Sequence, residues 1–190
     1  MTSAKRRVAI TGLGLVTPVG NDVETTWQAL LAGRSGGAEI SLFDASGFPV
    51  HIAAEVKGLR DDAIEDRRLL KHSTRAHRFA LVAAEQALRD AGIRPTDATA
   101  TRWGCAVGAG MMTSEFVDLA AVQAHSAADG ELHADRLLID PVANDPMVFS
   151  RSNASQGLAL LTRRYGIRGY ATAVHTACAS GGQEIGRAHV

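Results

Sequence analysis

One cysteine in this chain lies where its sulfur could act as a nucleophile. Cys178 follows an apolar run at residues 170–174 and precedes Ala179, Ser180 and two glycines. This order predicts a strand that ends abruptly and turns into a helix, with the cysteine exposed at the turn. The amide groups and the positive dipole end of a helix N-terminus favour a thiolate. The pattern therefore indicates thioester chemistry, and the alternative is a small buried hydrophobic cysteine.

Two separated motifs resemble those of the β-ketoacyl-acyl carrier protein synthases. Residues 174–181 read Val-His-Thr-Ala-Cys-Ala-Ser-Gly, which resembles the nucleophile motif of this family. Residues 8–21 read Val-Ala-Ile-Thr-Gly-Leu-Gly-Leu-Val-Thr-Pro-Val-Gly-Asn, which is similar to its N-terminal signature. Residues 103–108 and 165–169 resemble its third strand and its approach to the cysteine. The resemblance covers nearly the whole chain and is closest to the elongating synthases of dissociated fatty-acid and polyketide systems.

The resemblance implies an α/β thiolase-like layered fold, of which this chain supplies the N-terminal half only. Family members carry two similar halves, so we expect residues 1–190 to be an incomplete β-ketoacyl synthase N-terminal domain. The two histidines and the lysine that complete the family's chemistry lie in the other half. Neither His175 nor His189 matches those positions, and neither is given their role.

The activity implied by the resemblance is a decarboxylative Claisen condensation in fatty-acid or polyketide chain elongation. An acyl thioester held on Cys178 would react with malonyl-acyl carrier protein, so the enzyme would be an acyltransferase of the 3-oxoacyl-acyl carrier protein synthase type. We expect the fragment to be inactive alone. Two alternatives stay open: a catalytically silent partner subunit that determines chain length, and a degradative thiolase that uses coenzyme A thioesters.

The resemblance also implies an acyl pocket and a docking surface. Met111 follows a glycine-rich turn at a loop that matches the family's acyl-chain pocket, so it could line the tunnel; core filling is the alternative. The family docks its acidic acyl carrier protein through basic residues in the region of Arg67, Arg68 and Lys71. These three residues are the expected docking patch, and a solvated helix face is the alternative.

Composition favours a soluble cytoplasmic protein that needs no cofactor. The chain of 190 residues is 46% hydrophobic and 21% charged, with a formal net charge of zero, so it offers no electrostatic reason to bind nucleic acid. Its two cysteines form no disulfide framework or clustered metal site, and we expect no metal. We also expect no secretion signal and no membrane insertion.

The pair Gly12-x-Gly14 follows an apolar run and could suggest a dinucleotide-binding turn. The dinucleotide-binding fingerprint requires a third small residue at the start of a helix, whereas Thr17 and Pro18 follow the glycines here. We therefore interpret the glycines as a packing turn.

Strands and helices alternate along the chain, as in a layered α/β domain with a mostly parallel sheet. We expect strands over residues 8–15, 103–108 and 170–174. The expected helices include one capped by Asn21 and Glu24 and ended by Gly33, one from Ser73 to Gly92, a helix, turn and short helix within 117–138, and one ended by Gly166. The resemblance implies that the strand at 170–174 pairs with its counterpart in a homodimer or in a heterodimer with a related subunit.

Residues 184–190 depart from the apolar, alanine-rich helix that the family places after its cysteine. They read Glu-Ile-Gly-Arg-Ala-His-Val, which matches an in-frame translation of a common sequencing-library adapter. Our hypothesis is that this segment is not native, and the alternative is a genuine short paralogue.

Overall fold

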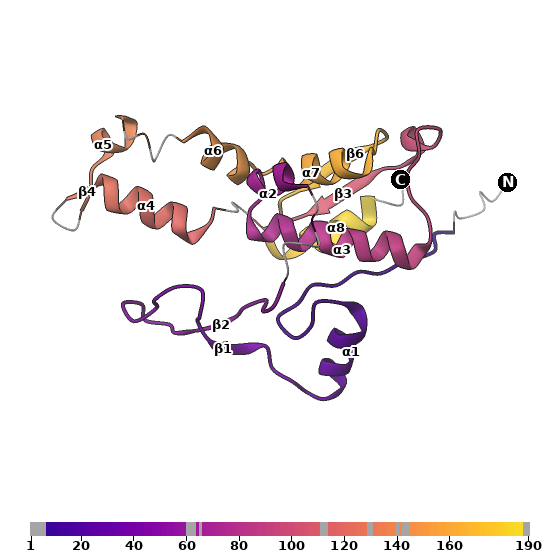
Figure 1. Cartoon of the computed structure of the whole chain (residues 1–190), viewed down its shortest axis with the longest axis horizontal. Coiled ribbons are helices and arrows are strands. Elements are labelled where there is room, and N and C mark those ends of the chain that lie inside the picture. Colours follow the sequence, from indigo (N-terminus) through magenta and orange to yellow (C-terminus); the bar gives the residue numbers. More distant parts are fainter. Residues whose placement is uncertain are drawn as a thin grey trace. The chain divides into compact units, whose positions relative to one another are not determined.

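The computed structural model describes residues 7–59, 64, 66–110, 114–128, 131–139, 141 and 145–187. The chain divides into two compact units, which are described separately (Figure 1). Unit 1 comprises residues 1–65 and 79–94, and unit 2 comprises residues 66–78 and 95–190.

Unit 1 contains α1 (Val23–Leu31), the strands β1 (Gly37–Glu39) and β2 (Ile52–Ala54), and most of α3 (Arg75–Ala91). The two strands pair antiparallel. Each of them is three residues long.

The expected N-terminal cap of α1 is wrong by one residue. Asp22, and not Asn21, caps the helix, because its carboxylate accepts a hydrogen bond of 2.7 Å from the amide of Thr25. Asn21 instead donates its side-chain amide to the carbonyl of Lys57 at 2.8 Å. The predicted end of α1 is confirmed, since Gly33 adopts a left-handed φ of 62°.

The predicted strand over residues 8–15 is an extended segment without a strand partner among the described residues. Side chains of α3 take the place of such a partner: the amide of Leu13 donates to Asp90 at 2.9 Å, and the amide of Leu15 donates to Gln86 at 3.0 Å. Val8 and Ile10 remain 58% and 83% exposed. The expectation of a strand fails here because no strand of the described residues lies beside the segment.

Gly12 and Gly14 let this segment lie directly on α3. A Cβ atom at Gly14 would fall 1.9 Å from the carbonyl oxygen of Ala83, and one at Gly12 would fall 2.2 Å from that of Ala87. The alanines of α3 that face the two glycines are spaced four residues apart and present little bulk. The interpretation of the glycine pair as a packing feature is consistent with these contacts.

Unit 2 holds the remaining elements. In chain order they are α2 (Arg67–Lys71), the first turn of α3, η2 (Ala100–Arg102), β3 (Cys105–Gly108), α4 (Phe116–Ser126), β4 (Ala127–Ala128), β5 (Glu131–Leu132), α5 (Ala134–Ile139), α6 (Pro146–Ser152), α7 (Gln156–Tyr165), β6 (Ala171–Val174), η3 (Ala177–Ala179) and α8 (Ser180–Arg187).

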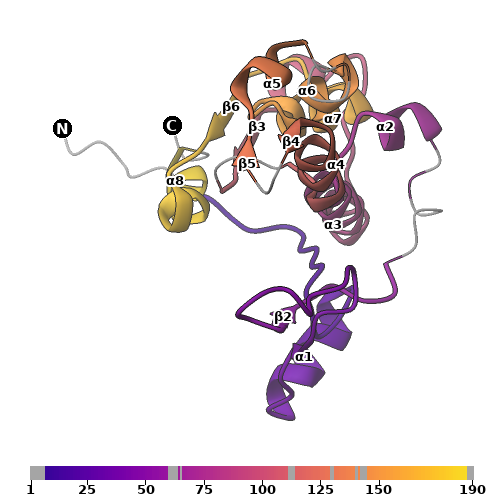
Figure 2. The same ribbon diagram turned by 90° about the vertical axis from the view of Figure 1, so that its left-hand side faces the viewer.

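The strands β3 and β6 form a parallel pair at the centre of unit 2. Their register runs from Cys105 opposite Ala171 to Gly108 opposite Val174. Both α7 and α8 pack against this pair, as Figures 1 and 2 show from two directions. Leu160 and Leu161 of α7 and Val174 of β6 are buried there. This part of the structure is the α/β layering that the alternation of elements predicts.

Other predicted elements of unit 2 are confirmed with small differences. The helix, turn and short helix expected within 117–138 are α4 and α5, with the β4–β5 hairpin between them. The helix ended by Gly166 is α7, and that glycine has a φ of 66°. No helix in the described part of the chain is long and apolar enough to cross a membrane.

The glycine contacts in unit 1 make a prediction about stability. Substitution Gly14→Ala should lower the free energy of unfolding by about 1–3 kcal/mol, because the added methyl group overlaps backbone atoms of α3. Gly47→Ala is the matched control, since nothing lies within 4 Å of its added Cβ. Urea unfolding followed by circular dichroism measures both variants, and equal midpoints for the two would contradict the proposed packing.

Candidate active site

Cys178 occupies a turn between a strand and a helix, as its sequence context predicts. It is the central residue of η3, four residues after the last residue of β6 and two residues before the first residue of α8, and its side chain is exposed. Within the described residues, no hydrogen bond is found for its backbone amide. The turn therefore presents a thiol and a free amide donor together at a helix N-terminus.

The residue before the cysteine has a strained backbone. Ala177 adopts a φ of 50°, in the left-handed region that residues with a side chain rarely enter. Such a conformation costs about 1–3 kcal/mol and persists only where the surroundings hold it. Sharp strand-to-helix turns of this kind raise a nucleophile above the end of a sheet.

Ser180 holds the turn closed from the helix side. Its hydroxyl accepts a hydrogen bond of 2.9 Å from the amide of Thr176 and donates one of 2.8 Å to the carbonyl of Ala109. The residue is only 3% exposed. One buried hydroxyl therefore joins the two sides of the turn and links it to the segment that follows β3.

His175 makes the corresponding link from the strand side. Its Nδ1 lies 3.0 Å from the carbonyl oxygen of Gly110. The amide of Ala109 also donates to the carbonyl of Val174 at 3.0 Å, which continues the ladder of the two strands by one step. The side chains on both sides of Cys178 are thus bound to consecutive carbonyl groups, those of Ala109 and Gly110.

Sequence reasoning missed these links. In the sequence, Ser180 is only a small residue of the motif at residues 174–181, and His175 is a residue of that motif to which no role is given. Their acceptors lie 71 and 65 positions away in the sequence. The only local signal is that a hydroxyl and an imidazole flank the cysteine, and this signal does not identify their partners.

The second cysteine lies in a different environment. Cys105 is half-buried in β3, and this burial raises the pKa of its thiol, as does the neighbouring Glu184 carboxylate. Burial also raises the pKa of Glu184, although the amide of Gly108 donates a hydrogen bond to that carboxylate. Cys105 is therefore the less reactive candidate of the two.

The remaining predicted site residues are on α2 or outside the described part of the chain. Met111, the predicted acyl-pocket residue, lies outside the described residues, as does His189. Arg67, Arg68 and Lys71 are all exposed on α2. The hypothesis about residues 184–190 stays a prediction: residues 184–187 complete α8, and residues 188–190 are not described.

Two hollows border the predicted docking patch. Lys71 lines a hollow of about 460 Å³ together with Arg75, Arg78 and Arg151. Arg68 lines another of about 270 Å³, to which α7 contributes Arg163. Four further basic residues therefore line the hollows beside the predicted patch of three: Arg75, Arg78, Arg151 and Arg163. Arg151 and Arg163 could not be found from sequence, because α6 and α7 bring them from 80 or more positions away.

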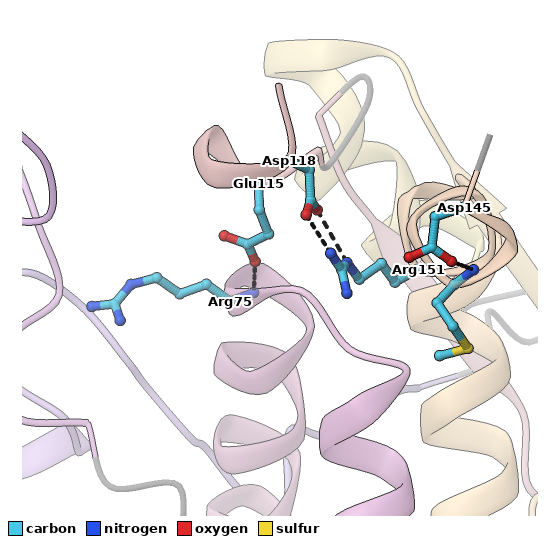
Figure 3. A network of polar contacts seen from close by, with 6 residues as sticks. Arg75, Glu115, Asp118, Asp145 and Arg151 are labelled. Atoms are coloured by element: carbon cyan, nitrogen blue, oxygen red, sulfur yellow. Dashed lines mark hydrogen bonds and ion pairs between the residues drawn. The ribbon is translucent and has the colours of Figure 1, made fainter. Parts of the chain in front are cut away.

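A network of polar contacts fixes the wall of the larger hollow (Figure 3). Glu115 accepts a hydrogen bond from the backbone amide of Arg75 at the start of α3. Arg151 of α6 pairs with Asp118 of α4 through two hydrogen bonds, one of them 3.1 Å long. Asp145 caps α6 at the amide of Met147, at 2.8 Å. In the part of the chain that the structure describes, no group of three or more His, Cys, Asp or Glu residues could hold a metal ion.

Fold and site together define a layered α/β protein with an exposed cysteine at a strand-to-helix turn, and comparison with known proteins agrees with this fold. Residues 5–190 match the family model "Beta-ketoacyl synthase, N-terminal domain". The chain therefore belongs to the β-ketoacyl synthase family, and the family assignment made from the motifs is confirmed.

Relatives and solved structures give the same result. The chain is 35% identical over 185 residues to 3-oxoacyl-[acyl-carrier-protein] synthase 2 of Coxiella burnetii, and 31% identical over 185 residues to that of Vibrio cholerae. Each match covers 97% of this chain and 42% of the relative, so the chain spans less than half of either relative's length.

Among solved structures, the ishigamide ketosynthase/chain length factor matches with a TM-score of 0.73 and 29% identity, over 98% of this chain and 45% of that one. A type II polyketide ketosynthase in complex with its acyl carrier protein matches with a TM-score of 0.68 and 24% identity, over 98% of this chain and 42% of that one. The second likeness concerns the fold alone.

The two hydrogen bonds of the Ser180 hydroxyl predict that removal of this hydroxyl destabilises the fold. Substitution Ser180→Ala should lower the free energy of unfolding by about 1–3 kcal/mol, because it leaves the amide of Thr176 and the carbonyl of Ala109 without their partner. Ser155→Ala is the control, because Ser155 is exposed and its side chain makes no cap hydrogen bond. If denaturant unfolding places the two variants within about 0.5 kcal/mol of each other, the role assigned to Ser180 is wrong.

Proposed function

We propose that the protein of which this chain forms part condenses an acyl thioester with malonyl-acyl carrier protein in fatty-acid or polyketide chain elongation. The observation that carries the proposal is the exposed Cys178 at a strained turn between β6 and α8. The relatives, named 3-oxoacyl-[acyl-carrier-protein] synthase 2, support this activity.

The proposed reaction begins with transthioesterification. The Cys178 sulfur attacks the acyl thioester of the carrier, the carbon–sulfur bond to the carrier breaks, and the carrier thiol leaves with the proton that the cysteine gives up. Malonyl carrier protein then loses carbon dioxide, and the resulting carbanion attacks the acyl group on Cys178. The new carbon–carbon bond forms as the cysteine thiolate departs.

The negative oxygen that forms on the attacked carbonyl needs hydrogen-bond donors at the turn. The backbone amide of Cys178 is our candidate for one of them, because no described residue accepts its hydrogen bond. By the family resemblance, a second donor, the two histidines and the lysine lie outside this chain. The chain alone is therefore expected to form the acyl-cysteine without completing the condensation.

We propose an acidic acyl carrier protein as the partner, docked on the exposed basic patch of α2. The hollows beside the patch bring Arg163 of α7, which is exposed, close to Arg68, whereas Arg151 is paired with Asp118. The charge of Arg163 would strengthen attraction to an acidic partner. We also propose a dimer formed along β6. Among the described residues, β6 pairs with β3 alone, so its other edge has no strand on it.

A catalytically silent subunit that sets chain length is the second candidate. The likeness to a ketosynthase/chain length factor structure supports it. Such subunits usually lack the nucleophile. The presence of Cys178 at an open turn favours the condensing enzyme.

A crosslinking experiment tests the proposed nucleophile. An acyl carrier protein whose pantetheine arm ends in a thiol-reactive group should become attached to this chain at Cys178, and peptide mapping by mass spectrometry locates the bond. Cys178→Ala should abolish the attachment, whereas the control Cys105→Ala should keep it, since Cys105 is half-buried with a raised pKa. Attachment that survives in Cys178→Ala would overturn the proposal.

Charge reversal tests the docking patch. Arg67→Glu combined with Arg68→Glu should slow this attachment by about tenfold at low salt, because charged surface residues act mainly on the association rate. High salt should reduce the difference from the unmodified chain. The matched control reverses Arg136 and Arg164, which are exposed elsewhere in unit 2. Equal rates for the two double variants would remove α2 from the docking surface.

A further inference from the structure

We propose that the smaller of the two hollows in unit 2 binds a phosphate group, either as free inorganic phosphate or as the head of a small phosphate monoester. This hollow has a volume of about 270 Å³ and lies wholly within unit 2. Arg68 of α2, Ser150 of α6 and Arg163 of α7 are among the residues that line it. No described residue of the Cys178 turn lines it, so the site is separate from the proposed condensation.

Contacts between α2 and α7 hold the walls of the smaller hollow in place. The side-chain amide of Gln156 donates to the carbonyl of His72 at 3.0 Å, and both residues line the hollow. Leu69 of α2 and Leu160 of α7 also line it, and both are buried. The backbone that carries the polar side chains is therefore ordered before a ligand arrives, which lowers the entropic cost of binding.

The two arginines of the smaller hollow lack a nearby countercharge. Among the described residues, no ion pair is found for Arg68 or for Arg163. Two positive charges that face the same hollow repel each other. An anion bound between them would replace this repulsion with two attractions.

The larger hollow has more basic residues but is the weaker candidate. Arg151 there is paired with Asp118, and Glu115 adds a carboxylate to the wall. Arg78 donates its side chain to the hydroxyl of Ser73 at 3.3 Å. The cations of the larger hollow thus have partners within the protein, whereas those of the smaller hollow do not.

One carboxylate, that of Asp66, opposes an anion in the smaller hollow. One of its oxygens accepts the backbone amide of Arg68 at 2.8 Å and so caps α2. Two guanidinium groups against one carboxylate still leave the lining with an excess of positive charge. Removal of the Asp66 charge should therefore strengthen the binding of an anion, in the opposite direction to removal of an arginine.

The donors of the smaller hollow suit a phosphate group better than a carboxylate. A phosphate monoester carries a charge of about −1.5 to −2 at pH 7 and three acceptor oxygens. Each guanidinium is a planar fork that can hold two of these oxygens. The hydroxyl of Ser150 and the imidazole of His72 can donate to the third. A carboxylate, with two oxygens and one charge, would use only part of this set.

The size of the smaller hollow limits what else the ligand can carry. Pockets for drug-sized ligands measure about 300–1,000 Å³. A hollow of about 270 Å³ is therefore suited to a phosphate head with few further atoms, and a nucleotide would extend beyond it.

Isothermal titration calorimetry on the 190-residue chain tests this site with three probes: inorganic phosphate, glycerol 3-phosphate and acetate, at pH 7 and constant ionic strength. The variants are Arg163→Gln, Arg163→Lys and Asp66→Asn. The matched control is Arg164→Gln, because Arg164 is exposed beside Arg163 on α7 and does not line the hollow. Arg68 is left unchanged because it also belongs to the proposed docking patch. Urea unfolding checks that each variant is folded.

Both phosphates should bind at least tenfold more tightly than acetate. Arg163→Gln should weaken phosphate binding by about tenfold, the usual effect of a hydrogen bond to a charged group, and Arg163→Lys should restore only part of the loss because lysine has no fork. Asp66→Asn should tighten binding by about threefold, since asparagine still caps α2. Arg164→Gln should leave the affinity unchanged.

The two phosphates distinguish the source of the ligand. Equal affinity for both would identify the free anion as sufficient, and tighter binding of glycerol 3-phosphate would identify a monoester. Either result supports a phosphate site.

Four results would overturn the phosphate site. They are no measurable binding of either phosphate, acetate binding as tight as phosphate binding, equal weakening in Arg163→Gln and Arg164→Gln, and an unchanged affinity in Asp66→Asn. Slower carrier-protein attachment in Arg163→Gln with unchanged phosphate binding would also overturn it, and would assign the hollow to the docking surface. The titrations do not involve Cys178, so failure of this site and failure of the proposed condensation are distinguishable.

Discussion

The parallel pairing of β3 with β6 is the constraint on which the candidate site depends. The register that places Gly108 opposite Val174 brings both strands to their ends at the same level. Residues 109–110 therefore lie beside the turn at residues 175–180, and the hydrogen bonds of Ser180 and His175 become available. A shift of one residue along either strand would remove both carbonyl partners and leave Ala177 strained without support.

Local signals in the sequence predict much of this fold. Gly33, Gly92 and Gly166 end their helices in left-handed conformations, because only glycine adopts them without steric cost. The position of Cys178 at a strand-to-helix turn follows from the apolar run before it and the small residues around it. The cap of α1 was displaced by one residue because asparagine and aspartate cap helices about equally well, and sequence does not say which of two neighbours will do so.

The parts that could not be predicted depend on distant contacts. An apolar run predicts a strand at residues 8–15, yet a strand needs a neighbour, and side chains of α3 take its amides instead. The surroundings of the proposed docking patch include Arg151 and Arg163, which become neighbours of α2 only when α6 and α7 pack in unit 2. Hydrophobic periodicity and motifs each describe one segment of the sequence, so they carry no information about contacts between distant segments.

The exposure of the Cys178 thiol at the turn makes this residue sensitive to oxidants. A thiol that an acyl group can reach is also open to peroxide, which converts thiolates first to sulfenic acid and then, irreversibly, to sulfinic acid. The exposed sulfur of Cys178 is the one at risk, while Cys105 is sheltered in its strand and held in the thiol form by a raised pKa. Oxidative damage would therefore fall on the sulfur atom that the proposed condensation needs, and would leave the sheltered Cys105 unchanged.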